Sequence, residues 1–141
     1  GAGIAAIQIG VTKRIFMFEI TKNPRYPDAA PIPLTVLVNP EVAVADAEEC
    51  EYMEGCLSVP GLRGPVNRPK AVSYSAVTPE GKPISSNGTV DGFHARVVQH
   101  ELDHLDGKLF PSRISDHTRF GFSEELEAHG VIAAVAAPKK E

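Results

Sequence analysis

Twelve prolines and twelve glycines divide this 141-residue chain into short runs, and this punctuation limits where long helices can form. Three runs are rich in β-branched and aromatic residues and are typical of strands. They are 14–20 (RIFMFEI), 34–40 (LTVLVNP) and 70–77 (KAVSYSAV), and the third leads into a turn with the sequence TPEGKP. Between the first two, residues 21–33 carry four prolines, so we expect a surface loop there, because proline cannot donate a sheet hydrogen bond.

One long helix is expected between Asp91 and about Asp106. Asp91 is a typical N-cap residue, and Gly107 stands where a left-handed residue would end the helix. With 3.6 residues per turn, one broad and mostly apolar face of this helix carries five residues. These are Phe93, Val97, His100, Glu101 and His104. We interpret the neighbouring His94 and Asp106 as surface residues.

The order of these elements predicts an α+β fold. We expect short, mostly antiparallel sheets packed around a central helix that carries the H-E-x-x-H motif, followed by a C-terminal helix. That second helix would begin at Ser123, weaken at Gly130 and leave residues 138–141 as a frayed tail. The length predicts a single domain over residues 1–141.

Composition excludes several classes of protein. A formal charge of −4 and an isoelectric point near 5.7 do not provide the basic surface of a nucleic-acid binder. No run approaches the roughly 18 consecutive apolar residues of a membrane span. The two cysteines, Cys50 and Cys56, are too few for a disulfide scaffold. We interpret Cys50 as a small buried side chain.

The stretch QHELDHLDG, residues 99–107, predicts a metal site. Two histidines at i and i+4 rise from adjacent turns of one helix face and can bind the same ion, while Glu101 stands beside it as a general base. Two half-buried histidines with a solvated glutamate are the alternative interpretation. A third ligand is needed, and Cys56, in the turn-forming segment EGCLSVP, is a stronger candidate than the downstream His117 and His129. For Cys56 too, a small buried side chain is the alternative.

Three separated motifs resemble those of the peptide deformylase family. GAGIAAIQ (residues 1–8) matches G-x-G-x-A-A-x-Q, EGCLS (residues 54–58) matches the cysteine motif of the family, and QHELDH (residues 99–104) matches Q-H-E-x-D-H. The resemblance extends from Gly1 to about Phe110. Family members carry a helical segment before the first motif, so we expect this chain to lack its N-terminal helical segment.

The resemblance implies a role for six residues. Cys56, His100 and His104 would bind one divalent metal ion, Glu101 would be the acid/base, and Gln8 and the backbone N–H of Leu57 would face the formyl oxygen. It implies Fe(II) as the physiological ion, with Zn, Ni or Co in preparations, whereas ligand type and spacing alone favour zinc. Gln99 and Asp103 would either orient ligands or tie the helix to the sheet.

The implied substrates are N-formylmethionyl nascent peptides, with the ribosome as a candidate place of encounter and no direct recognition of nucleic acid or membrane. Residues expected around the peptide are Ala2, Gly3, Gly55, Tyr52, Phe93, Val97 and Arg63, although a lone arginine such as Arg63 is more often a solvated charge. The bacterial cytoplasm is the expected compartment, and an organelle is the alternative. Two other functions stay open: an H-E-x-x-H zinc endopeptidase, and a truncated deformylase-like fold that binds metal without turnover.

Overall fold

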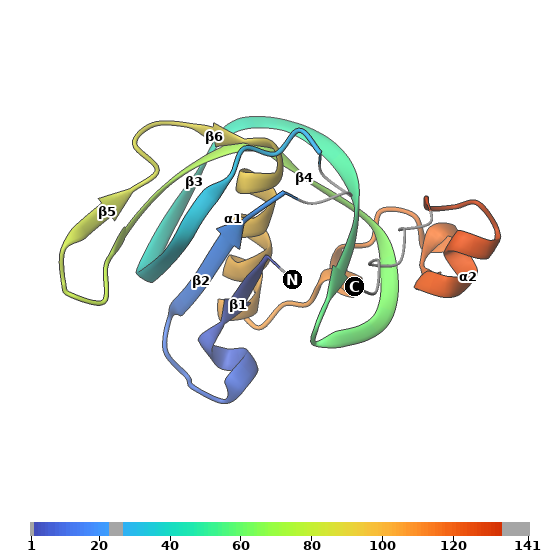
Figure 1. The fold of residues 1–141 in the computed structure, drawn as a ribbon, viewed down its shortest axis with the longest axis horizontal. Coiled ribbons are helices and arrows are strands. Elements are labelled where there is room, and N and C mark those ends of the chain that lie inside the picture. The colour runs from blue at the N-terminus through green and yellow to red at the C-terminus, as the bar shows by residue number, and fades with distance from the viewer. Residues whose placement is uncertain (1, 23–26, 134–141) are drawn as a thin grey trace, which may run out of the picture.

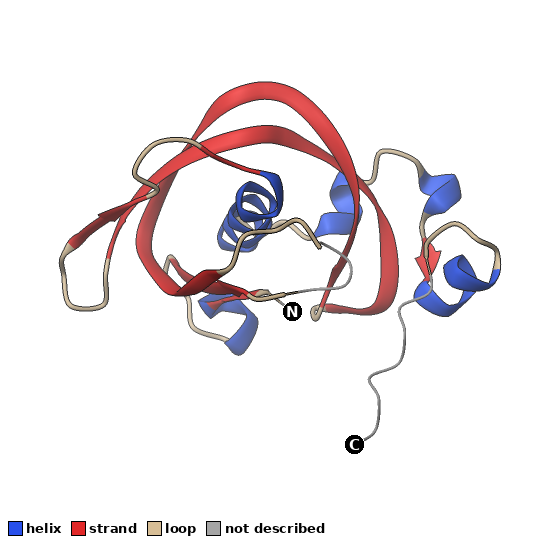
Figure 2. Ribbon diagram, turned by 45° about the horizontal axis from the view of Figure 1, so that its top comes forward, coloured by secondary structure: helices blue, strands red, loops and turns tan. Residues whose placement is uncertain are grey.

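Two long strands form the frame of the fold. The computed structural model describes residues 2–22 and 27–133. Within it, β3 (Ile32–Cys56) and β4 (Val59–Val77) pair antiparallel along most of their lengths and are joined by a tight turn at residues 57–58. Irregular register at Val38–Glu41, at 44–49 and at Gly55–Cys56 lets this ribbon curve strongly (Figure 2).

Short strands extend the frame into one seven-stranded sheet. They are β1 (Gly3–Ala5), β2 (Ile15–Ile20), β5 (Pro83–Ser85), β6 (Val90–Asp91) and β7 (Gly121–Phe122). The order along the sheet is β1-β2-β3-β4-β5, and β6 and β7 also pair with β4. Every one of these strand pairings is antiparallel. The predicted antiparallel arrangement with few helices is therefore confirmed.

The helix α1 (Gly92–Leu105) lies inside the curve of the β3–β4 ribbon (Figures 1 and 2). Its residues Val97 and Val98 pack against Phe16, Phe18 and other apolar side chains of the sheet, and this cluster is the core. Gly107 follows in the predicted left-handed conformation, with φ of 73°. Since α1 is held by the core on one side, its histidines are presented from a fixed support.

The other helical segments are short. They are η1 (Ala6–Ile9), η2 (Phe110–Arg113), η3 (His117–Arg119) and α2 (Ser123–Ala128), of which the η segments are 3-10 helices. As predicted, α2 begins at Ser123, and it ends before Gly130, which has a φ of 69°. The expected frayed tail at 138–141 lies outside the described residues. Among the residues that are described, no helix combines the length and the apolar character needed to cross a bilayer.

The expectation of several short sheets was wrong. The predicted strands at 34–40 and 70–77 are parts of β3 and β4, which run for 25 and 19 residues in a single sheet. Pro40 does not end β3, because Asn39 takes a φ of 52° and the register shifts there, so that the strand continues beyond the irregularity.

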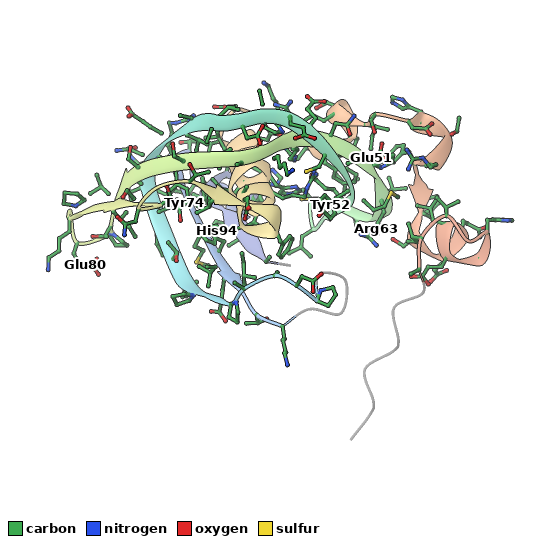
Figure 3. All side chains as sticks on the ribbon, turned by 90° about the horizontal axis from the view of Figure 1, so that it is seen from above. Glu51, Tyr52, Arg63, Tyr74, Glu80 and His94 are labelled. Carbon is green, nitrogen blue, oxygen red and sulfur yellow. The ribbon has the colours of Figure 1, made fainter. Side chains whose placement is uncertain are left out.

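The interpretation of His94 as a surface residue was also wrong. Its Nε2 lies 3.0 Å from the hydroxyl of Tyr74, and its ring centroid lies 5.4 Å from that of Phe18. His94 and Tyr74 lie side by side in Figure 3. This histidine is half-buried, and burial lowers its pKa, because the charged form loses hydration. Asp106 is exposed as expected and pairs with Arg14 at 3.1 Å.

Candidate metal centre and substrate pocket

The two motif histidines lie one turn apart on α1. The ring centroids of His100 and His104 are 5.0 Å apart, with the ring planes at 77° to one another. This is the arrangement that an i, i+4 spacing imposes, since the two Cβ atoms rise from the same helix face. The two rings therefore point toward one region beside the helix.

Cys56 reaches the same region from the sheet. It is the last residue of β3, and the tight turn into β4 aims its sulfur at α1, with Sγ 3.3 Å from Nε2 of His104. The candidate ligand atoms of Cys56, His100 and His104 all lie within 4.8 Å of one another. One thiolate and two imidazoles suit a divalent transition metal and leave a coordination position free for a substrate. The chemistry of the donor set thus fits the metal that the sequence predicts.

The electrostatics of the trio favour the thiolate form of Cys56. Burial alone would raise the pKa of the Cys56 thiol, but hydrogen bonds with His100 and His104 outweigh it and lower that pKa to about 5. Burial would lower the pKa of His100, but its hydrogen bonds to Cys56 and Glu54 raise it to about 9. Cys56 is consequently a thiolate at neutral pH, which is the form that binds metal.

Glu54 is a functional residue that sequence reasoning did not single out. Its Oε1 accepts a hydrogen bond from Nδ1 of His100 at 2.8 Å, which leaves Nε2 of that ring for a ligand. Burial to 5% exposure would raise the pKa of Glu54, but hydrogen bonds from His100 and Arg68 hold it at about 2. An anionic carboxylate behind a ligating histidine fixes the ring and its tautomer.

Glu101 stands beside the trio without belonging to it. The side chain is 3% exposed, and its Oε2 has no hydrogen-bond partner among the described residues. Burial raises its pKa to about 7, since the charge loses hydration, although His100 and His104 act in the opposite direction. A buried carboxyl group with an unused oxygen next to a metal site is suited to accept and return a proton.

The amide of Gln8 is held in a defined orientation. Its Oε1 accepts from the backbone N–H of Ala5 at 2.8 Å, and its Nε2 donates to Oγ of Ser58 at 2.9 Å and lies 3.9 Å from Sγ of Cys56. The amide NH2 group is therefore directed at the β3–β4 turn. Leu57, whose backbone N–H is the second predicted donor, lies in that turn next to Cys56.

A pocket of about 320 Å³ opens beside these groups. Six predicted peptide-contacting residues line it: Ala2, Gly3, Gly55, Arg63, Phe93 and Val97. Gln8, Leu57, Cys56, His100 and Glu101 contribute to the same lining. Apart from Tyr52, the predicted catalytic and substrate-binding residues that line the pocket come from the N-terminal residues, η1, the end of β3 and its turn, β4 and α1.

Tyr52 is the one predicted peptide-contacting residue that the pocket lining does not include. Its exposed ring lies beneath the guanidinium group of Arg96, 4.8 Å from the ring centroid. Arg96 is buried and lines the pocket instead. The position of Arg96 one turn before His100 on α1 was the sequence signal that could have identified it.

Arg63 is not the solvated charge that a lone arginine usually is. It is buried in β4, and its Nη2 donates to the backbone carbonyl of Met53 at 3.0 Å. Figure 3 shows Arg63 near the part of the sheet that carries Tyr52. Gln99 ties α1 to the sheet, because its Nε2 donates to the carbonyl of Pro69 at 3.0 Å.

Comparison of the chain with known proteins gives relatives over most of its length. A family model described as Polypeptide deformylase matches residues 1–120. Peptide deformylase 2 of Pseudomonas putida is 50% identical over 126 residues, which cover 89% of this chain and 70% of the relative. Peptide deformylase 2 of Ralstonia nicotianae is 52% identical over 134 residues, which cover 92% and 74%.

Solved structures of peptide deformylases are also similar to this chain. The class I type b peptide deformylase of Acinetobacter baumannii with bound Met-Ala-Ser has a TM-score of 0.75 at 46% identity, covering 81% of this chain and 70% of that one. The peptide deformylase of Synechococcus elongatus in complex with actinonin has a TM-score of 0.72 at 32% identity, covering 94% and 65%. The chain therefore belongs to the peptide deformylase family and is an enzyme that removes N-formyl groups from the amino termini of peptides.

Proposed function

We propose that this enzyme releases formate from N-formylmethionyl peptides with a divalent metal ion. The ion would be held by Cys56, at the end of β3, and by His100 and His104, on α1 at the centre of the fold. The observation that carries the proposal is the convergence of these three side chains, within 4.8 Å, beside the buried carboxyl group of Glu101. A zinc endopeptidase is not favoured, since the relatives are deformylases and the third ligand is a cysteine rather than a downstream carboxylate or histidine.

The metal complements what the side chains provide. A bound divalent ion supplies Lewis-acid chemistry at the formyl carbonyl and at the attacking water. We propose Fe(II) as the ion in the cell, with Zn(II), Ni(II) or Co(II) as substitutes in prepared protein. The thiolate character of Cys56 favours such borderline or soft ions over Mg²⁺ or Ca²⁺.

Glu101 moves the proton. Its unpartnered Oε2 takes a proton from the water molecule as the water oxygen bonds to the formyl carbon. It then returns the proton to the amine nitrogen as the C–N bond breaks. The products are formate and a free methionyl amino terminus, so that Glu101 ends in the state in which it began.

Gln8 and Leu57 stabilise the oxygen of the tetrahedral intermediate. The anchored amide of Gln8 and the backbone N–H of Leu57 lie on the Cys56 side of the pocket and act as two prepositioned donors. Donors of this kind are worth a few kcal/mol each when charge develops in the transition state. The hydrogen bond from the Ala5 N–H is what prevents the Gln8 amide from rotating.

The pocket selects methionine through its apolar wall. Phe93 and Val97 provide that wall, and an unbranched thioether side chain adapts to it. Gly55, at the end of β3, is exposed at the edge where an extended peptide would add as a further strand. A Met-Ala-Ser peptide is bound to the Acinetobacter baumannii relative, which supports this class of ligand.

Gly3→Ala is expected to lower kcat about 10- to 100-fold with little loss of stability. A Cβ at residue 3 would lie 2.8 Å from Oε1 of Glu101, so the carboxyl group must move, and small misplacements of a reacting group carry costs of this size. Steady-state kinetics and thermal melting check the prediction. Gly121→Ala is the control, because its Cβ would meet Leu126 at 3.6 Å, an ordinary contact. Equal kcat in the two variants would contradict it.

Formate release is the direct test of the proposed function. Protein prepared anaerobically with Fe(II) is expected to release formate from formyl-Met-Ala-Ser and to leave unformylated Met-Ala-Ser intact. A parallel sample stripped with a chelator should be inactive and should recover when Fe(II) is restored. Bound metal without formate release would contradict the proposal and favour a metal-binding fold without turnover.

The relatives also support a proposal about where the activity takes place. We propose one catalytic domain over residues 1–141 that acts on nascent polypeptides in the bacterial cytoplasm. Support comes from the family match over residues 1–120 and from the bacterial origin of the relatives.

A further inference from the structure

A series of ion pairs connects a surface arginine to the candidate ligand His100. Arg113 donates from Nε and Nη2 to Asp103 at 2.6 and 2.9 Å. Asp103 also accepts from Nη1 of Arg68 at 2.9 Å, and Arg68 donates from Nε and Nη2 to Glu54 at 2.6 and 3.0 Å. Glu54 in turn accepts from Nδ1 of His100. We call these five residues the arginine–carboxylate relay.

The geometry of the relay fixes orientation as well as distance. Arg113 binds Asp103 through two parallel hydrogen bonds, and Arg68 binds Glu54 in the same way. A bidentate contact of this kind restricts rotation of both partners. Glu54, Arg68 and Asp103 are buried, whereas the Arg113 side chain is 38% exposed. The relay therefore runs from the protein surface at η2 through a buried interior to the metal centre.

The charges along the relay are shared, so its members are not independent. Asp103 has two arginine partners, and Arg68 has two carboxylate partners. Without Arg113, buried Asp103 would retain only Arg68 among these contacts and would draw that guanidinium group away from Glu54. Glu54 is held behind His100 by two arginines, and the bidentate contact from Arg68 would then loosen while the contact from Arg96 remained.

We propose that Arg113 is a positioning residue for the metal-binding site and acts on His100 through Asp103, Arg68 and Glu54. The inference rests on the proposed function in that His100 must be a metal ligand. Arg113 is neither a lining residue of the pocket nor a member of the trio of candidate ligands, and its hydrogen bonds connect it to His100 through the relay. The competing view is that Arg113 only fastens η2 to α1.

Arg119 provides a matched control. Its side chain is also 38% exposed and also forms two close contacts with carboxylate oxygens, one to Glu51 at 2.7 Å and one to Asp116 at 2.9 Å. It belongs to η3, the next short helix along the chain. The contacts of Glu51 and Asp116 remain at the surface and do not include His100. Removing Arg119 therefore deletes two ion-pair contacts at the surface without disturbing the relay.

The test compares metal affinity in Arg113→Met and Arg119→Met by chelator competition with Co(II) in the absence of substrate. Direct partners of a ligating histidine typically change affinity 10- to 100-fold, and Arg113 is further away, so we expect a loss of about 3- to 10-fold. The visible absorption of bound Co(II) should shift in Arg113→Met alone. Arg119→Met should bind Co(II) within about 2-fold of the wild type.

Arg113→Lys keeps the positive charge but loses the bidentate contact, and an intermediate loss of affinity is expected. If Arg113→Met folds poorly, the metal affinity of Arg113→Lys tests the relay in its place. If both Arg113 variants match Arg119→Met in Co(II) affinity and in spectrum, the relay is contradicted, whereas the proposed ligand set is not. Wild-type affinity in His100→Ala would overturn both the proposed ligand set and the relay.

Discussion

Replacing Glu101 with alanine or glutamine is expected to leave metal binding intact and to lower kcat/KM about 100- to 10,000-fold, the range typical of a lost general acid/base. Glu101 is outside the trio of candidate ligands, so its removal takes no donor from the ion. Its buried Oε2 has no hydrogen-bond partner among the described residues, so proton transfer is the function that is lost. Formate release and metal content, measured on the same samples, check both parts.

Glu101→Gln is the sharper of the two variants, because it preserves the shape of the side chain and removes only the ability to accept a proton. Glu41→Gln is the control, since Glu41 is exposed on β3. Wild-type formate release by Glu101→Gln would contradict the assignment of Glu101 as the acid/base. Loss of metal in Glu101→Gln would instead make this residue part of the metal centre.

The sequence was most informative where local signals coincide. For α1, the N-cap position, the apolar stripe and the left-handed Gly107 all indicate one helix, and its predicted limits agree with Gly92–Leu105 to within a residue. The structure also brings the motif histidines and Cys56 together as expected. These predictions depended on helical spacing and on ligand chemistry, both of which can be read along the chain.

The extent of the strands could not be predicted in the same way. Residues 41–50 of β3 are mostly exposed, so they lack the alternation of apolar and polar side chains that marks a half-buried strand. Their partner is β4, which continues the pairing across irregular register. What makes this segment a strand is the neighbouring strand, and local sequence carries little information about it.

The residues around Glu54 were missed because buried charges depend on register. Arg68 stands opposite Cys50 in the β3–β4 ladder, yet its side chain reaches Glu54 and Asp103. Arg96 joins from α1 through a hydrogen bond to Glu54. Charged residues are usually solvated, and only their position in the fold shows that these are paired and buried.

Replacing Cys56 with alanine is expected to weaken metal binding by more than about 100-fold and to abolish formate release. The variant removes one of the three candidate donors, the one that is a thiolate at neutral pH. Loss of a direct ligand should exceed the 10- to 100-fold effects of its outer partners. His104→Ala is expected to behave in the same way. Metal content after dialysis and formate release are the measurements.

The chain supplies its own control in Cys50→Ala. Both cysteines are half-buried in β3, and the mutation deletes the same atom, but Sγ of Cys50 makes only a weak contact, 3.9 Å from the carbonyl of Arg68. Metal content and turnover should stay near wild type in Cys50→Ala. If the two variants lost metal equally, the sulfur of Cys56 would be important for packing rather than as a ligand. If only Cys56→Ala lost metal, the loss would be assigned to ligation of the ion by Sγ of Cys56.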